Sequence, residues 1–148
     1  MGANSMYLTQ RRYIVDILRQ AKMDLAKPCT TPMATTIRLS RSDTLSTPNT
    51  SMYRSIIGSL HYLSLTRPDI AYAVHQVSKF MHDPRDYHWQ AVKRILCYSK
   101  HTISSGLFLS KNSTLQLHGF TDADWAGDSD DRRSVGSYCV FLGSNPIS

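Results

Sequence analysis

Acidic residues cluster in one short stretch of this 148-residue sequence, HGFTDADWAGDSDDRRS at residues 118–134, which holds five aspartates and two arginines. Hard divalent cations bind clustered carboxylate oxygens, and a carboxylate at the end of a strand is held rigidly enough to act as a ligand. Strict alternation in LQLHGFTDADW places Asp122 and Asp124 on the same face of such a strand. These two carboxylates are the candidate metal ligands, and the chemistry that they suggest is metal-assisted.

The acidic stretch is also compatible with a role that involves no metal. A calcium-binding EF-hand loop is excluded, because counting from Asp122 puts Ala126 at position 5, where an oxygen ligand is required. A solvated hairpin turn fits, with Arg132 and Arg133 balancing the negative charge. On spacing alone, the polar turn is favoured over the metal site.

The cysteines and histidines lack the spacing of a metal site or a disulfide framework. Cys29, Cys97 and Cys139 are widely separated and odd in number, which argues against both a set of disulfides and a zinc site. The six histidines form no HExxH pattern, so surface or helix-cap positions are predicted for them. We expect no cofactor.

The composition predicts a globular protein with a basic surface. Apolar residues make up 41% of the sequence, too many for wholesale disorder, and the formal net charge is +6. This charge favours an acidic partner such as nucleic acid, although the basic residues occur in isolated pairs rather than one cluster. No apolar stretch approaches a membrane span, and the N-terminus lacks the apolar core of a secretory signal peptide.

The elements that must position the acidic stretch follow from the spacing of apolar residues. Helices are predicted at about residues 9–23, 52–65, 68–81 and 85–100. The apolar side chains expected to be buried by them are Ile14, Ile17, Leu18, Ala21, Ile56, Ile57, Leu60, Leu63, Ile70, Ala73, Val74, Val77, Met81, Trp89, Val92, Ile95 and Leu96.

Three local features predict where the helices begin and how they pack. The hydroxyl of Thr9 is able to cap the first helix. Gly58 lowers the helix propensity of the second, which indicates close packing against a neighbouring element. Pro68 stands in the first turn of the third helix, where proline is tolerated.

The pattern changes after residue 105 to the short β-type runs SGLFLS, STLQLHGFTDAD and SYCVFLG. The sequence therefore predicts an α+β fold. Its expected parts are an N-terminal helix (1–27), a Pro/Ser/Thr-rich linker (28–51), a helical core (52–105) and a β segment (106–148). Because a few strands without covering helices are marginal, we expect the helical core to be the stable part.

Six sequence motifs occur along the chain in the following order: LTQRRYIVDIL, KPCTTPM, YRSIIGSLHYLSLTRPDIAYAV, SKFMHDPRDYHWQAVKRIL, LQLHGFTDADWAGD and DRRS…YCVFLG. From Tyr7 onwards the sequence thereby resembles the Pol polyprotein of copia-type retrotransposons. The resemblance implies the tail of a reverse transcriptase, with its thumb and connection helices, followed by a truncated RNase H-like β segment. In that family the aspartate of the first RNase H strand is a metal ligand, and Asp122 occupies its place.

The resemblance also implies that residues 1–148 lack most of the carboxylates that catalysis in this family needs. RNase H chemistry uses two metal ions and several carboxylates, and the remaining carboxylates and the polymerase aspartates would lie outside residues 1–148. We therefore expect no enzyme activity, no catalytic residue and no bound metal. Two departures from the family pattern support the same expectation. First, RRSVGSY stands where the family has RRSTSGY. Second, YSKHT stands where the family has YLKGT, which puts Ser99 at the position of an apolar contact and His101 at the position of a glycine suited to a helix C-cap.

A second resemblance is to the secreted RxLR effectors of downy mildew oomycetes, which are delivered into plant cells and commonly suppress immunity and cell death. It implies secretion, then contacts with host proteins in the nucleus or cytoplasm of the plant cell. The sequence has no Arg-x-Leu-Arg word: DILR at 16–19 lacks the first arginine, and RLSR at 38–41 has the wrong order. The functions left open are a non-catalytic effector, a functionless Pol remnant and a weak nucleic-acid-binding fragment.

Overall fold

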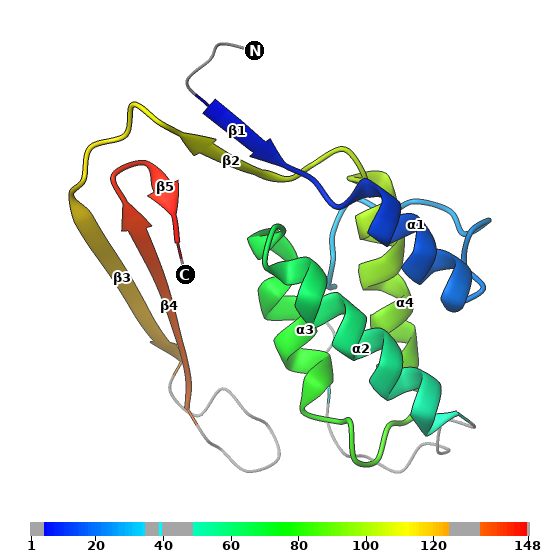
Figure 1. Cartoon of the computed structure of the whole chain (residues 1–148). Helices are drawn as coiled ribbons and strands as arrows, with labels where there is room; N and C mark the ends of the chain where they lie inside the picture. The colour runs from blue at the N-terminus through cyan, green and yellow to red at the C-terminus, as the bar shows by residue number, and fades with distance from the viewer. Residues whose placement is uncertain (1–4, 35–38, 40–48, 125–133, 148) are drawn as a thin grey trace. The chain divides into compact units, whose positions relative to one another are not determined.

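The computed structural model describes residues 5–34, 39, 49–124 and 134–147. The chain divides into two compact units, a helical unit of residues 9–105 and a β unit that joins residues 1–8 to residues 106–148 (Figure 1). The helices that the structure describes belong to the first unit and the strands to the second. The expected α+β class is therefore confirmed.

The helical unit contains the four predicted helices, with a short 3-10 turn before the third. Its elements are α1 (Arg11–Gln20), α2 (Thr50–Ser64), η1 (Pro68–Ile70), α3 (Ala71–Ser78) and α4 (Asp86–His101). Most of the linker expected at residues 28–51 lies outside the described residues.

The first two helices begin differently from the prediction. Gln10 is the N-cap of α1 and makes no side-chain capping bond, so the prediction that Thr9 caps this helix is wrong. The second helix begins two residues early because the side chain of Asn49 accepts a hydrogen bond from the backbone N–H of Met52 at 2.9 Å. This bond satisfies one of the amide groups left free at a helix start.

The start of α4 is held by a buried histidine. The backbone N–H of Arg85 donates to Nδ1 of His88 at 2.9 Å, which is one half of a capping box. The His88 ring is fully buried and stacks on Phe80 with 3.8 Å between ring centroids. The predicted surface or cap position of this histidine is thus a cap, placed inside the protein.

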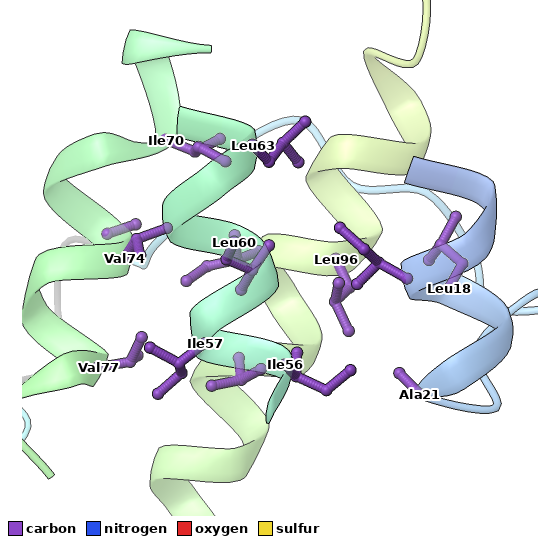
Figure 2. Close-up of a cluster of buried hydrophobic side chains, with 14 of the residues drawn as sticks. Leu18, Ala21, Ile56, Ile57, Leu60, Leu63, Ile70, Val74, Val77 and Leu96 are labelled. Atoms are coloured by element: carbon purple, nitrogen blue, oxygen red, sulfur yellow. The ribbon is translucent and has the colours of Figure 1, made fainter. Parts of the chain in front are cut away.

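The core of the helical unit forms where the apolar faces of the helices meet, as Figure 2 shows for side chains from α1, α2, α3 and α4. Fifteen of the seventeen side chains predicted to be buried are buried; Met81 and Trp89 are only partly buried against this cluster. Tyr53 is also fully buried, and its hydroxyl donates to the carbonyl of Val77 at 2.7 Å. Burial, followed by the charge of Tyr87, raises the pKa of Tyr53 above its ordinary value.

The expectation that Gly58 packs closely against a neighbour is wrong. This residue lies on the exposed side of α2, and a Cβ added there would meet none of the described atoms within 4 Å. The glycine therefore lowers the helix propensity without a packing reason in the described structure.

The β unit consists of two small antiparallel sheets. One pairs β1 (Ser5–Leu8) with β2 (Leu107–Ser110), and the other has the order β3 (Leu117–Asp124), β4 (Val135–Leu142), β5 (Asn145–Pro146). The three predicted β runs are present, but the first strand of the unit, β1, is not among the predicted elements. Its pairing partner lies about 100 residues further along the chain.

Polar contacts, rather than buried side chains, hold the β unit together. Among its side chains whose exposure is described, none is buried. The amide group of Asn145 accepts from the N–H of Ser110 at 2.7 Å and donates to its carbonyl at 2.9 Å, which links β5 to β2. Gly143 turns the chain between β4 and β5 with a φ of 61°, where a Cβ would clash with Oγ of Ser113.

Candidate functional site

Asp122 lies in β3 directly opposite Ser137 of β4. Residues opposite each other in antiparallel strands share a face, so Phe120 and its partner Cys139 are on the Asp122 side of the hairpin. Phe120 forms an edge-to-face pair with Phe141 at 5.9 Å between centroids. Asp122 is exposed, so this face presents a solvated carboxylate beside an aromatic pair.

Asp124 ends the same strand, opposite Val135 in the register. The strand that was expected to carry both aspartates is present, with the predicted spacing of two residues. In the part of the chain that the structure describes, no three His, Cys, Asp or Glu residues gather closely enough to hold a metal ion. Asp122 and Asp124 stay the candidate ligands, and the expectation that they bind no metal stays a prediction.

The remainder of the acidic stretch lies outside the described residues. It contains three further aspartates and the two arginines that were predicted to balance them: Asp128, Asp130, Asp131, Arg132 and Arg133. The choice between a metal site and a polar turn is therefore decided neither by Asp122 nor by its described neighbours.

A second polar group, absent from the sequence-based predictions, lies inside the helical unit around Arg67, which is 1% exposed. Its Nε and Nη2 atoms donate to the two carboxylate oxygens of Asp69 at 2.9 and 2.7 Å. Its Nη1 and Nη2 atoms donate to the carbonyl and hydroxyl oxygens of Thr102 at 3.0 and 2.6 Å. The Tyr98 hydroxyl donates to Asp69 at 2.9 Å, so this Arg67 network ties the turn before α3 to the end of α4.

The hydrogen bonds of the Arg67 network favour the ionised form of Asp69. Burial alone would raise the pKa of Asp69, but the hydrogen bonds from Arg67 and Tyr98 outweigh it and lower that pKa below its ordinary value. Burial and the bond to Asp69 raise the pKa of Tyr98. A fixed ion pair of this kind positions helices and is poorly suited to move protons. Its sequence signal is RPD before a helix, a pattern that by itself predicts only a helix start.

A histidine and a serine of the helical unit lie in contact, as a catalytic base and its nucleophile would. Nε2 of His61 lies 2.8 Å from Oγ of Ser78. The Ser78 hydroxyl donates its proton to the carbonyl of Val74 at 2.6 Å, so it accepts from the imidazole. A nucleophilic serine donates to its base, and this pair therefore lacks the arrangement of a nucleophile and its activating base.

The chain has sequence relatives among the Pol polyproteins of retrotransposons. The chain belongs to the family of copia-type retrotransposon Pol proteins. It is 50% identical over 143 residues to the retrovirus-related Pol polyprotein from transposon RE2 of Arabidopsis thaliana, and 52% identical over 143 residues to that from transposon RE1. Each match covers 97% of this chain, which spans 10% of either relative.

The effector resemblance covers less of the chain. The sequence is 44% identical over 97 residues to secreted RxLR effector protein 161 of Plasmopara viticola, a match that covers 65% of this chain and 68% of that protein. No family model and no solved structure matches the sequence. None of the described helices combines the length and the apolar character needed to cross a membrane.

Proposed function

We propose that these 148 residues are a non-catalytic segment of a copia-type Pol that acts through surface contacts. The observation that carries this proposal is the identity of about one half over 97% of the chain. In this assignment the helical unit corresponds to the thumb and connection helices of a reverse transcriptase. The β3–β4 hairpin corresponds to the opening strands of RNase H, with Asp122 at the first metal-ligand position.

The proposal that the polypeptide is not an enzyme rests on the carboxylates that the reaction needs. Hydrolysis of the RNA strand by two metal ions requires several carboxylates around both ions. The candidate ligands in this sequence are Asp122 and Asp124, and Asp122 is exposed in the described hairpin. A polypeptide of these residues, tested by itself, is therefore expected to bind rather than to cleave.

A cleavage assay tests the absence of catalysis. The 148-residue polypeptide is incubated with a labelled RNA–DNA hybrid and magnesium, beside an Asp122→Asn variant and a complete RNase H as the positive control. We expect the wild type and the variant to match the buffer blank. Cleavage by the wild type that the variant loses would overturn the proposal.

A finer proposal is that the segment acts as an effector against plant cells, and the match to 68% of an RxLR effector supports it. The protein would be secreted and would then contact host proteins in the nucleus or cytoplasm of the plant cell. The helical unit would supply the surface for these contacts, because it holds the buried core of the described protein.

The effector proposal is tested by transient expression in leaf tissue beside a death-inducing protein. Val74→Asp puts an unpaired charge at a fully buried position of α3 and is expected to abolish suppression of cell death by unfolding the helical unit. Ala71→Asp, at the exposed start of the same helix, and Asp122→Asn are matched controls expected to retain it. No suppression by the wild type at normal abundance would refute the effector role and favour a functionless remnant.

Nucleic-acid contact is the alternative, and the distribution of charge supports it. The helical unit holds fourteen lysines and arginines against six aspartates, whereas the β unit holds three against five. A basic unit attracts phosphate groups and releases their counterions on binding. Weak, salt-dependent binding of an RNA–DNA hybrid to the helical unit is therefore expected in this alternative.

Salt titration separates this alternative from the effector role. Replacing Arg11 and Arg12, which are exposed on α1, by glutamine should lower the slope of binding against salt by about two. Lys111→Gln, an exposed position of the β unit, is the matched control and should leave the slope unchanged. Binding that is equally weak in all variants and insensitive to salt would contradict nucleic-acid recognition.

A further inference from the structure

After α1, the chain runs beside α4 as a segment that begins with a turn, here called the strap (residues 24–31). The ammonium group of Lys100 donates to the carbonyl oxygens of Asp24 and Ala26 at 2.6 and 2.9 Å. The strap is thus fixed at its beginning to the last turn of α4, without any regular secondary structure of its own.

The far end of the strap brings two cysteines together. The backbone N–H of Cys29 donates to the carbonyl of Cys97 at 3.4 Å, and the Cys29 thiol lies 3.4 Å from the carbonyl of Arg94, one turn earlier in α4. Side chains of a helix tilt toward its N-terminus, so the side chain of Cys97 leans over the turn on which the Cys29 thiol rests. Thr31, two residues after Cys29, also contacts α4, since its hydroxyl accepts from the Arg94 guanidinium at 2.6 Å.

The Cys29 thiol also acts electrostatically on the Cys97 thiol. Partial burial, followed by the charge of Cys29, raises the pKa of the Cys97 thiol above its ordinary value. Both cysteines are reduced and half-buried in the structure, which leaves them within reach of a small oxidant. Cys139, the third cysteine of the sequence, belongs to the β unit.

We propose that Cys29 and Cys97 form a site of reversible oxidation, at which a peroxide converts the two thiols into a disulfide between the strap and α4. One thiolate attacks the peroxide, which forms an S–O bond, breaks the O–O bond and releases hydroxide. The second thiolate then attacks this sulfur, which forms the S–S bond and releases a second hydroxide. The two protons lost by the thiols convert both hydroxides into water, and the two electrons reduce the peroxide.

The disulfide would close a loop that contains α2 and α3 and would tie α1 to α4 through the strap. A cross-link across so long a loop restricts the unfolded chain and stabilises the folded one. Because the thiolate is the reacting form and the Cys97 pKa is raised, oxidation should accelerate as the pH rises from about 7 to about 9.

The test is oxidation of the native polypeptide with a small excess of hydrogen peroxide, followed by alkylation and peptide mapping without reduction. We expect the Cys29–Cys97 peptide as the main product and a midpoint of thermal unfolding at least about 5 °C higher, which dithiothreitol reverses. Cys29→Ser and Cys97→Ser should each abolish the peptide and the rise, whereas Cys139→Ser should retain both.

A second measurement guards against variants that fold poorly. The wild type is oxidised in the presence and absence of concentrated urea, and the three pairings of its cysteines are counted. The proposal requires that the native chain favours Cys29–Cys97 and that urea removes this preference. Native pairings that include Cys139 as often as the other two cysteines would overturn the proposal, as would intermolecular dimers as the main product.

Discussion

The helical unit and the β unit of this protein are stabilised in different ways. The helical unit buries a continuous cluster of apolar side chains from four helices, and each buried aliphatic side chain contributes about 1.5–3 kcal/mol by leaving water. In the β unit no side chain of described exposure is buried, and the strands are joined by backbone pairing and by the amide of Asn145. Regular secondary structure is thus present in both units, but among the described residues the apolar core belongs to the helical unit.

The comparison shows why secondary structure alone is a poor guide to stability. A hydrogen bond contributes about 0.5–1.5 kcal/mol net, because it replaces bonds to water. Small sheets that expose both faces therefore depend on whatever covers them. The β unit exposes the aromatic residues Phe108, Phe120 and Tyr138 by more than half of their surfaces, which is the property expected of a sheet that packs poorly by itself.

The largest expected difference between the units concerns a core substitution. Leu60→Ala, at a fully buried position, should lower the free energy of unfolding of the helical unit by about 2–5 kcal/mol. Phe120→Ala in the β unit, where the ring is 63% exposed, should change that quantity by less than about 0.5 kcal/mol. Chemical denaturation followed by far-ultraviolet circular dichroism measures both, and equal losses would refute the contrast.

The Arg67 network should contribute less than the apolar core. Arg67→Met keeps much of the side-chain volume but leaves Asp69, Thr102 and Tyr98 with fewer partners, so a loss of roughly 1–3 kcal/mol is expected. Arg67→Lys keeps the charge without the two-pronged geometry and should lie between Met and the wild type. Denaturation midpoints of the three proteins test this order; a Met variant as stable as the wild type would show that the network is dispensable.

A backbone substitution should act on the β unit alone. Gly143→Ala puts a Cβ on a left-handed residue, which costs roughly 1–2 kcal/mol before any clash with Ser113 is counted. Amide resonances of β4 and β5 should broaden or shift in an NMR spectrum, while those of α2 and α4 stay in place. Ser144→Ala is the control at the neighbouring turn position. Helical resonances that move as far as those of the β unit would contradict an effect confined to the β unit.

The smallest expected effect is on the pH dependence of the helical unit. The folded pKa of Asp69 is below its ordinary value of 3.8, so its ion pair contributes stability above that pH, which is lost as the pH falls through the folded pKa. Asp69 is partly exposed, which limits the size of the effect. Urea midpoints measured from about pH 5 to about pH 2 should fall less steeply in Asp69→Asn than in the wild type; identical slopes would show that this carboxylate is not involved.

The helical part of the fold could be predicted from the sequence because its apolar residues recur with a helical period. The stripe from Ile70 to Val77 is sufficient to predict a buried face, and all of its predicted members are buried. Trp89 and Met81 are only partly buried, since position on a helix does not determine how far neighbours cover a large side chain. The prediction for Gly58 is wrong because a glycine in a helix has the same sequence signal whether or not it is packed.

Of the candidate site, only the strand that carries the two aspartates could be predicted from the sequence. Alternation along LHGFTDAD located β3 and both aspartates, but the partners that would turn a carboxylate into a metal site come from other segments. The contacts of Arg67 with Thr102, and of Cys29 with Cys97, join positions 35 and 68 residues apart. Such pairs have no periodic signature in a single sequence, because they arise only once the helices have packed.

The pairing of β1 with β2 has a consequence for the order in which the chain folds. Closing a flexible loop of about 100 residues costs roughly 4 kcal/mol of entropy. Four residue pairs without a buried side chain are too few to offset this cost without help. A folded helical unit lies between these two strands in the chain and removes most of that cost. We therefore expect β1 to dock late, and a chain stalled with an unfolded helical unit to present both strands as free edges able to join another molecule.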